Sequence, residues 1–241
     1  MFISAAQTDR FGRISIPAIA GILEDLAWRD ANRLSFGYDE LKERNLLWVL
    51  SRMKVKIYKR PNWREEIVGK TWACGVDGPF ARREFRIENK DGELMIEAVS
   101  HWLVVDASTH RMVRINSILD LFKADPKSVI EWSTSKLGDV KADFQSDFRD
   151  VLYSDIDLNQ HVNNARYLQR IIDSMSDEVI EKTEITGYEI NFLNEAVLGD
   201  KLAVVRNEVA EGEDQLAAII RESDGKETVR VKLEWKFRES E

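Results

Sequence analysis

The chain has 241 residues, 44% of them hydrophobic, which suits either one large domain or two small ones with a true core. Its net charge of −8 argues against general nucleic-acid binding. No apolar run approaches the ~20 residues of a membrane helix, and the first residues have the pattern of neither a secretory signal nor a transit peptide.

A single cysteine, Cys74, excludes an intrachain disulfide and a thiolate metal cluster. A chain with so little cysteine fits a reducing cytoplasm, which is the location we expect. Cys74 lies at the end of an expected strand, and we interpret it as a small packing residue and not as a nucleophile. The sequence contains no metal-ligand motif and no Gly-rich nucleotide loop, so no cofactor is expected.

The first predicted element is a long amphipathic helix, opened by Pro17 in its first turn with Ser15 or Ile16 near the cap. Its apolar residues keep the i, i+3, i+4, i+7, i+8 spacing of one helix face: Ile19, Ile22, Leu23, Leu26 and Ala27. About four antiparallel strands follow, two of them joined by an Asp-Gly turn at residues 91–92.

A basic stripe runs along one of these strands. Arg52, Lys54 and Lys56 alternate with apolar residues and therefore share one face of the strand, and Lys59 and Arg60 follow. The half of the chain that contains this stripe is also the more basic one. Residues 1–115 carry a net charge of +3, and the remainder carries −11. The stripe is either a solvated strand face or a docking surface for an acidic partner.

The two halves of the chain resemble each other. At one offset of 133 residues, the turn at Asp91-Gly92 matches Asp224-Gly225, and Trp102 matches Trp235. A second amphipathic helix, with Leu168 on its apolar face, precedes the second set of strands, as the first helix precedes the first set. This pattern favours a duplicated α+β unit over two unrelated domains.

The boundaries that follow from the repeat are 1–115 for the first unit, 116–147 for a linker with a little helix, and 148–241 for the second unit. In each unit we expect a long helix of about 16 residues wrapped by a curved antiparallel sheet. Two such copies in one chain form a pseudo-dimer.

The strongest candidate site precedes the second helix, in the stretch SDIDLNQHVNNARYL. Asp157, Asn159 and His161 occupy alternate positions, so in an extended segment their side chains would point to one face. When the starts of the two helices are matched, the first half has Phe11 and Arg13 opposite Asp157 and Asn159, and Ser15 opposite His161. Because the first half lacks the polar triplet, we favour a functional role for it over local capping.

Two further groups could act with the triplet. The helix is expected to begin near Val162 or Asn163, and the unpaired N–H groups from Val162 to Asn164 could stabilise an oxyanion. Glu195 lies at a break between two strands of the same half, where a solvated strand end is the alternative.

The sequence D-x-N-x-H-V-N-N, an amphipathic helix and a glutamate 34 residues after the histidine resemble the acyl-acyl-carrier-protein (acyl-ACP) thioesterases. The plant plastid enzymes and their bacterial relatives form this family, and the resemblance runs over nearly the whole chain. It implies a tandem (double) hot-dog fold and hydrolysis of fatty acyl-ACP to free fatty acid and carrier protein. It also implies that this chain is a bacterial relative of the plastid enzymes.

The resemblance implies a role for each of the site residues. Asp157, Asn159 and His161 match the polar triplet of the family, and Glu195 matches its downstream acid. Many plant members have a cysteine directly after this acid, where this chain has Ala196. A thiolate mechanism is therefore excluded, and the residues themselves leave open which of Asp157, His161 and Glu195 is the general base.

The resemblance also implies the partner, an acidic acyl-carrier protein whose phosphopantetheine arm carries the acyl chain. Its docking surface should be basic, which makes Arg52, Lys54, Lys56, Lys59 and Arg60 the candidates. The first unit would then shape the acyl pocket, and a homodimer of the chain is left open. Two alternative functions remain: an acyl-CoA thioesterase of the same fold, and a non-catalytic acyl-binding protein.

Overall fold

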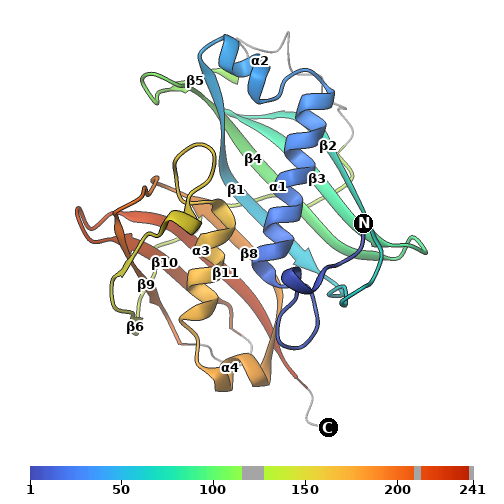
Figure 1. The fold of residues 1–241 in the computed structure, drawn as a ribbon, viewed down its shortest axis with the longest axis vertical. Helices are drawn as coiled ribbons and strands as arrows, with labels where there is room; N and C mark the ends of the chain where they lie inside the picture. Colours follow the sequence, from blue (N-terminus) through green and yellow to red (C-terminus); the bar gives the residue numbers. More distant parts are fainter. Residues whose placement is uncertain (116–127, 209–212, 239–241) are drawn as a thin grey trace. The chain divides into compact units, whose positions relative to one another are not determined.

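The computed structural model describes residues 1–115, 128–208 and 213–238, and the chain divides into two compact units, Met1–Ser135 and Lys136–Glu241. Most of the first half of the expected linker, with its short apolar piece, lies outside the described residues. Each unit is α+β, with an antiparallel sheet and few helices (Figure 1).

The first unit begins with a short 3-10 turn and two helices and continues with the strands of an antiparallel sheet. Its elements are η1 (Ala5–Gln7), α1 (Ile16–Arg33), α2 (Tyr38–Glu43), β1 (Leu46–Ile57), β2 (Ile67–Asp77), β3 (Phe80–Asn89), β4 (Leu94–Asp106) and β5 (Met112–Val113). The four long strands pair in the order β2-β3-β4-β1, and β5 pairs with β4.

Helix α1 confirms the first predicted helix, including its start. The Ser15 hydroxyl accepts a hydrogen bond from the Ala18 N–H, and Pro17 lies in the first turn, where its missing N–H costs nothing. The apolar face is buried as predicted, except that Leu26 is only partly buried. Leu26 packs on Gly69 of β2, where a Cβ would come within 2.7 Å of its side chain, so the glycine lets α1 approach the sheet closely.

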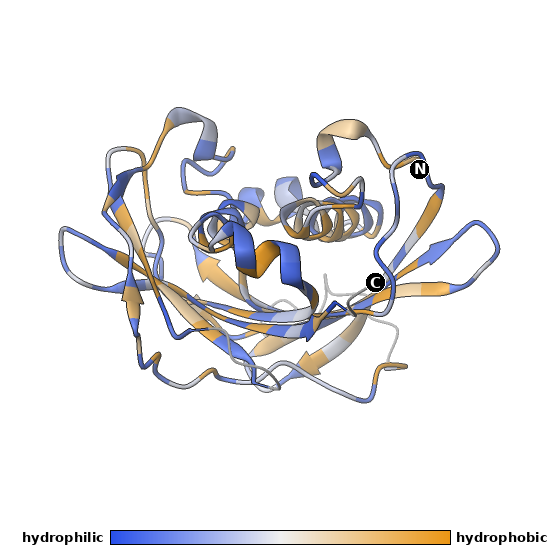
Figure 2. Cartoon of the chain, turned by 90° about the horizontal axis from the view of Figure 1, so that it is seen from below, coloured by the Kyte–Doolittle hydropathy of each residue, from blue (hydrophilic) through white to orange (hydrophobic). Residues whose placement is uncertain are grey.

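Irregular pairing bends the strands of this sheet. The register shifts by one residue between Leu50 and Arg52 where β1 pairs with β4, and between Ala73 and Gly75 where β2 pairs with β3. Such bulges add local twist and curvature to an antiparallel sheet. In the hydropathy-coloured view, polar and apolar residues mix along most strands, as half-buried sheets require (Figure 2).

The second unit repeats the order of two helices followed by four long strands, with a shorter first helix and shorter strands. Its elements are β6 (Phe144–Gln145), β7 (Arg149–Asp150), η3 (Tyr153–Asp155), α3 (Asn164–Asp173), α4 (Asp177–Lys182), β8 (Thr183–Phe192), β9 (Lys201–Arg206), β10 (Gln215–Arg221) and β11 (Glu227–Phe237). The long strands pair in the order β9-β10-β11-β8, which is the order β2-β3-β4-β1 of the first unit. Strands β6 and β7 pair with β9.

The second helix is shorter than the sequence predicts. Helix α3 ends at Asp173, so Met175, which extends the apolar spacing, is buried beyond the helix. The helix has 10 residues where about 16 were expected. Its N-cap is Asn163, whose side chain accepts a hydrogen bond from the Ala165 N–H.

Among the described residues, no helix is long and apolar enough to cross a membrane. The same part of the chain contains no group of three or more His, Cys, Asp and Glu side chains arranged to hold a metal ion.

Candidate active site

The stretch that contains the triplet is a tight turn and not an extended strand, so this prediction is wrong. The Asp157 N–H donates to the carbonyl of His161 at 2.9 Å, which closes the chain on itself. One carboxylate oxygen of Asp157 accepts the N–H of Asn159 at 2.7 Å and that of His161 at 3.4 Å. Gln160 has a φ of 65°, a left-handed conformation that a side chain disfavours. Asp157 therefore builds the turn.

The first unit contains the same turn, hydrogen bond for hydrogen bond. The Asp9 N–H donates to the carbonyl of Arg13 at 2.7 Å, and the Asp9 carboxylate accepts the N–H groups of Phe11 at 3.0 Å and Arg13 at 3.1 Å. Gly12 supplies the positive φ of 72°. The acid at the start of the turn is therefore needed for the shape of the chain in both units.

The other two positions of the triplet differ between the units. Phe11 and Arg13 stand where the second unit has Asn159 and His161. The sequence alignment, which matched Ser15 with His161, is wrong by two residues, because Ser15 is the N-cap of α1. What the first unit lacks is the amide and the imidazole, and not the aspartate.

Glu195 meets His161 in space although the two are far apart in sequence. It lies in the loop between β8 and β9, and its Oε2 is 3.3 Å from Nε2 of His161. The side chains of His161 and Glu195 are 29% and 46% exposed, so the pair is open to solvent. Asn159 is exposed on the same turn, and its side-chain amide has no partner among the described residues. The structure thus brings a carboxylate and an imidazole together, with an exposed amide on the same turn.

Two of the three predicted oxyanion donors are already used. The Val162 N–H donates to the carbonyl of Ala196 at 2.8 Å, and the Asn163 N–H donates to the carbonyl of Asp155 at 2.8 Å. For these two amides the prediction is wrong, because the turn consumes the donors that an isolated helix would leave unpaired. Asn164 is the first residue of α3, and its role stays a prediction.

Tyr167 of α3 contacts the loop of Glu195. The side chain is buried, and its ring packs edge-on against Phe192 with centroids 6.2 Å apart. Burial raises the pKa of the Tyr167 hydroxyl above its ordinary value, against the effect of a hydrogen bond from the Ala196 backbone, and the nearby charge of Glu195 raises it further. The hydroxyl therefore stays protonated and fixes the residue next to Glu195.

The place of Glu195 has a counterpart in the first unit. The Ile14 N–H donates to the carbonyl of Pro61 at 2.8 Å, as Val162 donates to Ala196 in the second unit. The residue before Pro61 is Arg60, which therefore stands where the second unit has its glutamate. The first unit thus keeps the backbone of the site and carries a cation in place of the acid.

Arg60 is not available for docking, contrary to prediction. Its side chain is only 7% exposed and pairs with the Asp9 carboxylate at 2.9 Å. The guanidinium also donates to the carbonyl of Ile14. These contacts lock the first unit's turn to its β1–β2 connection, which explains why the arginine is buried.

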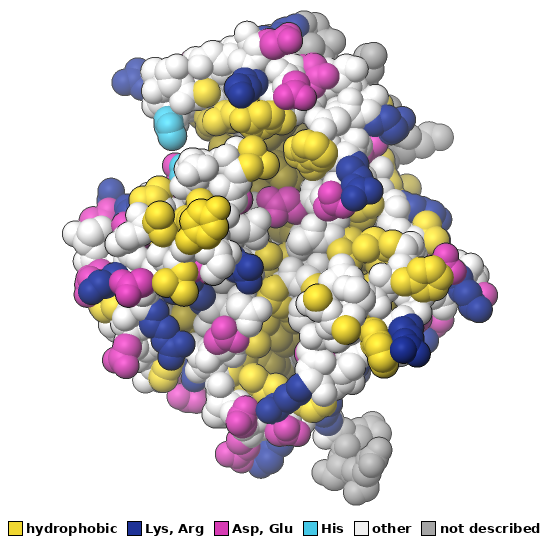
Figure 3. Space-filling view, viewed as in Figure 1, with side chains coloured by type: hydrophobic (Ala, Val, Ile, Leu, Met, Phe, Trp, Pro, Cys, Tyr) yellow, Lys and Arg dark blue, Asp and Glu magenta, His cyan; other side chains and the backbone are white. Residues whose placement is uncertain are grey.

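Arg52, Lys54 and Lys56 share one face of β1 as predicted, but that face is partly covered by the chain itself. Lys54 and Lys56 lie 5.9 and 5.0 Å from the ring centre of Trp132, and Arg52 lies 5.2 Å from that of Phe80. Lys59, with 51% of its side chain exposed, pairs with a glutamate at 3.6 Å. Figure 3 draws one face of the molecule, on which Lys and Arg side chains lie interspersed with Asp and Glu side chains.

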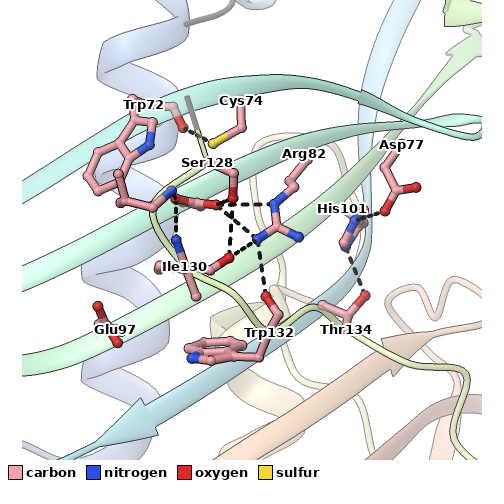
Figure 4. A network of polar contacts seen from close by, with 12 residues as sticks. Trp72, Cys74, Asp77, Arg82, Glu97, His101, Ser128, Ile130, Trp132 and Thr134 are labelled. Atoms are coloured by element: carbon pink, nitrogen blue, oxygen red, sulfur yellow. Dashed lines mark hydrogen bonds and ion pairs between the residues drawn. The ribbon is translucent and has the colours of Figure 1, made fainter. Parts of the chain in front are cut away.

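Residues 128–134, which we call the strap, cross this sheet and are held by buried polar groups (Figure 4). The fully buried Glu84 accepts the N–H groups of Val129 and Ile130 at 3.0 and 3.2 Å, as well as the Ser128 hydroxyl. Arg82 donates to the carbonyl of Ile130 at 2.8 Å and pairs with Glu84. Sequence reasoning missed the strap, because nothing in its composition marks where its backbone binds.

Cys74 has a structural role, as predicted, and His101 has one as well. Burial and the nearby Glu84 raise the pKa of the Cys74 thiol to about 12, so no thiolate is available at neutral pH. His101 is buried between Asp77, at 3.2 Å, and the hydroxyl of Thr134 in the strap, at 2.8 Å (Figure 4).

Comparisons with known proteins agree over both units. The model of the acyl-ACP thioesterase N-terminal domain matches residues 1–121, and that of the acyl-ACP thioesterase C-terminal domain matches residues 138–237. Among curated relatives, a palmitoyl-acyl carrier protein thioesterase of Gossypium hirsutum is 28% identical over 86% of this chain. The chain spans about half the length of the curated relatives it matches, 55% in this case.

Solved structures agree on the fold. An acyl-ACP thioesterase from Bacteroides thetaiotaomicron has a TM-score of 0.83 at 26% identity, covering 98% of this chain and 96% of that one. A 12:0-ACP thioesterase from Umbellularia californica has a TM-score of 0.84 at 22% identity, covering 99% and 96%.

Proposed function

This chain belongs to the acyl-ACP thioesterase family, and from that premise we propose that it hydrolyses fatty acyl-ACP to free fatty acid and carrier protein. We further propose a tandem hot-dog organisation in which residues 1–115 shape the acyl pocket, 116–147 link the units and 148–241 carry the chemistry. The repeated strand order and the repeated turn support this division. The proposed location is a bacterial cytoplasm, whereas the curated plant relatives are named chloroplastic.

The observation that carries the proposal is the difference between two otherwise matching turns. Both units keep the turn-forming aspartate, but only the second combines His161 with Glu195 at 3.3 Å and adds the exposed amide of Asn159. A feature required only for folding would be expected in both units. We therefore assign the chemistry to the second unit, with one site per chain.

The proposed reaction begins with a water molecule held by Glu195. Its oxygen attacks the thioester carbonyl carbon while its proton passes to the Glu195 carboxylate, which His161 orients through Nε2. The carbonyl π electrons move to the oxygen, which the Asn159 side-chain amide is proposed to stabilise. When the carbonyl re-forms, the C–S bond breaks, and the leaving sulfur takes the proton from Glu195. The products are a carboxylic acid and the phosphopantetheine thiol.

Asp157 has a different role in this proposal. Its carboxylate accepts two backbone N–H groups of its own turn, the same contacts that Asp9 makes in a unit without the histidine. A carboxylate committed to the backbone is poorly suited to collect a proton from water. We therefore propose Glu195 as the general base and Asp157 as the residue that shapes the turn.

A panel of acyl-ACP thioesters of increasing chain length tests the function, with thiol release and free fatty acid measured together. We expect equal amounts of both products and loss of turnover in His161→Ala. The matching CoA esters of each chain length identify an acyl-CoA thioesterase if they are hydrolysed faster. Binding of the acyl chain without thiol release from any ester would contradict the proposal and favour an acyl-binding protein.

Docking of the carrier protein on the basic stripe is a separate proposal. Of the predicted residues, Lys59 has a half-exposed side chain, whereas Lys54 and Lys56 contact Trp132 of the strap. We expect Lys59→Glu to raise KM for acyl-ACP, and the effect to shrink as salt rises, because electrostatic docking is screened. An unchanged KM at low salt would remove Lys59 from the docking surface.

A further inference from the structure

We infer that Arg221, the last residue of β10, is a positioning residue that fixes Glu195 for its reaction with water. This inference rests on the proposed function of the His161–Glu195 pair. The Nη1 of Arg221 donates to the backbone carbonyl of Glu195 at 2.7 Å, although the two residues are 26 positions apart. The motif that precedes α3 does not predict this contact.

The guanidinium is held rigidly before it reaches the loop of Glu195. Its Nε donates to Oδ1 of Asp224 at 3.0 Å and its Nη2 donates to Oδ2 at 2.8 Å, a bidentate pair that fixes the plane of the guanidinium. Asp200, at the end of the same loop, lies 3.7 Å from Nη1. The guanidinium of Arg221 therefore has one favourable orientation. It is set by the carboxylate of Asp224, by the nearby Asp200 and by burial of the side chain.

The loop of Glu195 is thus held at both of its central carbonyls. Arg221 binds the carbonyl of Glu195, and the Val162 N–H binds the carbonyl of Ala196. Val162 directly follows His161, so the second contact ties the loop to the turn with the imidazole. The two contacts together fix the backbone from which the Glu195 carboxylate reaches His161, whereas its side chain remains 46% exposed.

The first unit supplies an internal comparison. The Asn89 N–H donates to the carbonyl of Glu93 at 3.0 Å, as the Arg221 N–H donates to that of Lys226 at 2.9 Å, so Arg221 corresponds to Asn89 of the first unit. The turn residue Asp224 corresponds to Asp91, so the acid of the hairpin is kept while the arginine is not. The arginine occurs in the unit that has the glutamate and the histidine, as a role in their positioning requires.

The chain offers a closely matched control in Arg230 of β11. Its side chain is 18% exposed, against 19% for Arg221, and it pairs with an acid three residues away, Glu227. It also pairs with a second acid, Asp139, and donates to the carbonyl of Leu137. Arg230 therefore loses the same kinds of contact when it is replaced, but none of them involves a residue of the site.

The first measurement compares the kinetics of Arg221→Met and Arg230→Met on acyl-ACP. We expect Arg221→Met to lower kcat by about 10- to 100-fold with KM within about twofold, since small displacements of a reacting group cost rates of this order. Arg221→Lys should restore part of kcat, and Arg230→Met should leave kcat unchanged. Wild-type kcat in Arg221→Met, or an equal loss in both methionine variants, would overturn the inference.

A double variant separates positioning from a general loss of structure. If Arg221 acts through Glu195, Arg221→Met should cost almost nothing further in kcat when it is added to Glu195→Gln. A full additional loss in this background would show that Arg221 acts elsewhere, and would contradict the inference. Arg221→Lys replaces Arg221→Met in the cycle if the methionine variant does not fold.

An NMR measurement distinguishes failure of this inference from failure of the proposed function. The chain has three histidines, so the ring signals of His161 can be assigned by one substitution. These signals should move in Arg221→Met and stay in place in Arg230→Met. If the wild type hydrolyses no acyl-ACP, the proposed function fails, yet the NMR comparison still decides whether Arg221 controls the pair; unmoved signals would refute that.

Discussion

At the scale of residues, two turns of the same geometry separate structure from chemistry. Asp9 and Asp157 each accept the corresponding backbone N–H groups of their own turns. The shape of the turn therefore explains an aspartate at this position without a catalytic role. The pair formed by His161 and Glu195 has no equivalent in the first unit, where Arg13 takes the place of the imidazole. In the proposed function, the D-x-N-x-H pattern combines one residue that shapes the chain with two that would face the substrate.

Replacing Asp157 distinguishes these roles. Asp157→Asn keeps an oxygen that can accept both N–H groups, so we expect kcat to fall by less than about tenfold, whereas loss of a general base costs ~10²–10⁴-fold. Asp157→Ala should lower the free energy of unfolding by about 1–3 kcal/mol, since two N–H groups lose their acceptor. Steady-state kinetics and urea unfolding measure the two effects. An Asp157→Asn enzyme as slow as a Glu195 variant would make Asp157 the base.

At the scale of elements, the sequence predicts helices and hairpins better than the turn that contains the site. The start of α1 follows from the N-cap hydroxyl of Ser15 and from Pro17 in the first turn. Both residues act through local contacts, which a sequence reveals. The turn depends on a positive φ at Gln160. A glycine in the sequence would predict such a conformation, but a glutamine does not. The alternation of polar residues predicts an extended chain, which is wrong here, and the predicted alignment of the two units is two residues out of register.

A pair of glycine substitutions tests the geometry of the turn in the first unit. A Cβ at Gly12 would meet no atom within 4 Å, so Gly12→Ala is penalised only by its φ of 72°, and we expect a loss of about 1–2 kcal/mol in unfolding free energy. Gly21 lies inside α1, also without neighbours within 4 Å, and Gly21→Ala should gain about 0.5–1 kcal/mol. Chemical denaturation measures both; a stabilising Gly12→Ala would contradict the left-handed turn.

The strap is also an element whose stability depends on pH. Burial works to raise the pKa of Glu84, but hydrogen bonds from Ser128 and Val129 and the ion pair with Arg82 outweigh it and hold the pKa below its ordinary value. A lowered pKa in the folded state means that the ionised Glu84 stabilises the fold above the unfolded pKa of about 4.3 and that this stabilisation is lost as pH falls further.

Glu84→Gln should therefore be less stable than the wild type at neutral pH, and the difference should shrink as pH falls below about 4.3. Urea unfolding at a series of pH values measures the difference. Glu88→Gln, on the same strand but with a lysine partner at the exposed edge, serves as the control and should have little effect. A difference between wild type and Glu84→Gln that is constant with pH would show that the charge of Glu84 does not hold the strap.

At the scale of the whole molecule, the repeat in the sequence agrees with a shared strand order, but it does not predict how each copy uses its polar residues. The repeated hairpin at one offset anticipates the shared strand order of the two units. The basic stripe was interpreted as an open surface, whereas Lys54 and Lys56 contact Trp132, and Arg60 is buried against Asp9. Such partners are far apart in sequence, so alternation along one strand cannot reveal them.

The central claim is that Glu195, in the second unit alone, takes the proton from water during thioester hydrolysis. The most direct measurement is kcat of Glu195→Gln on a good acyl-ACP substrate, with the isosteric amide keeping the shape of the loop. We predict a fall in kcat of about 10²–10⁴-fold with KM little changed. A Glu195→Gln enzyme that turns over at the wild-type rate would contradict the account.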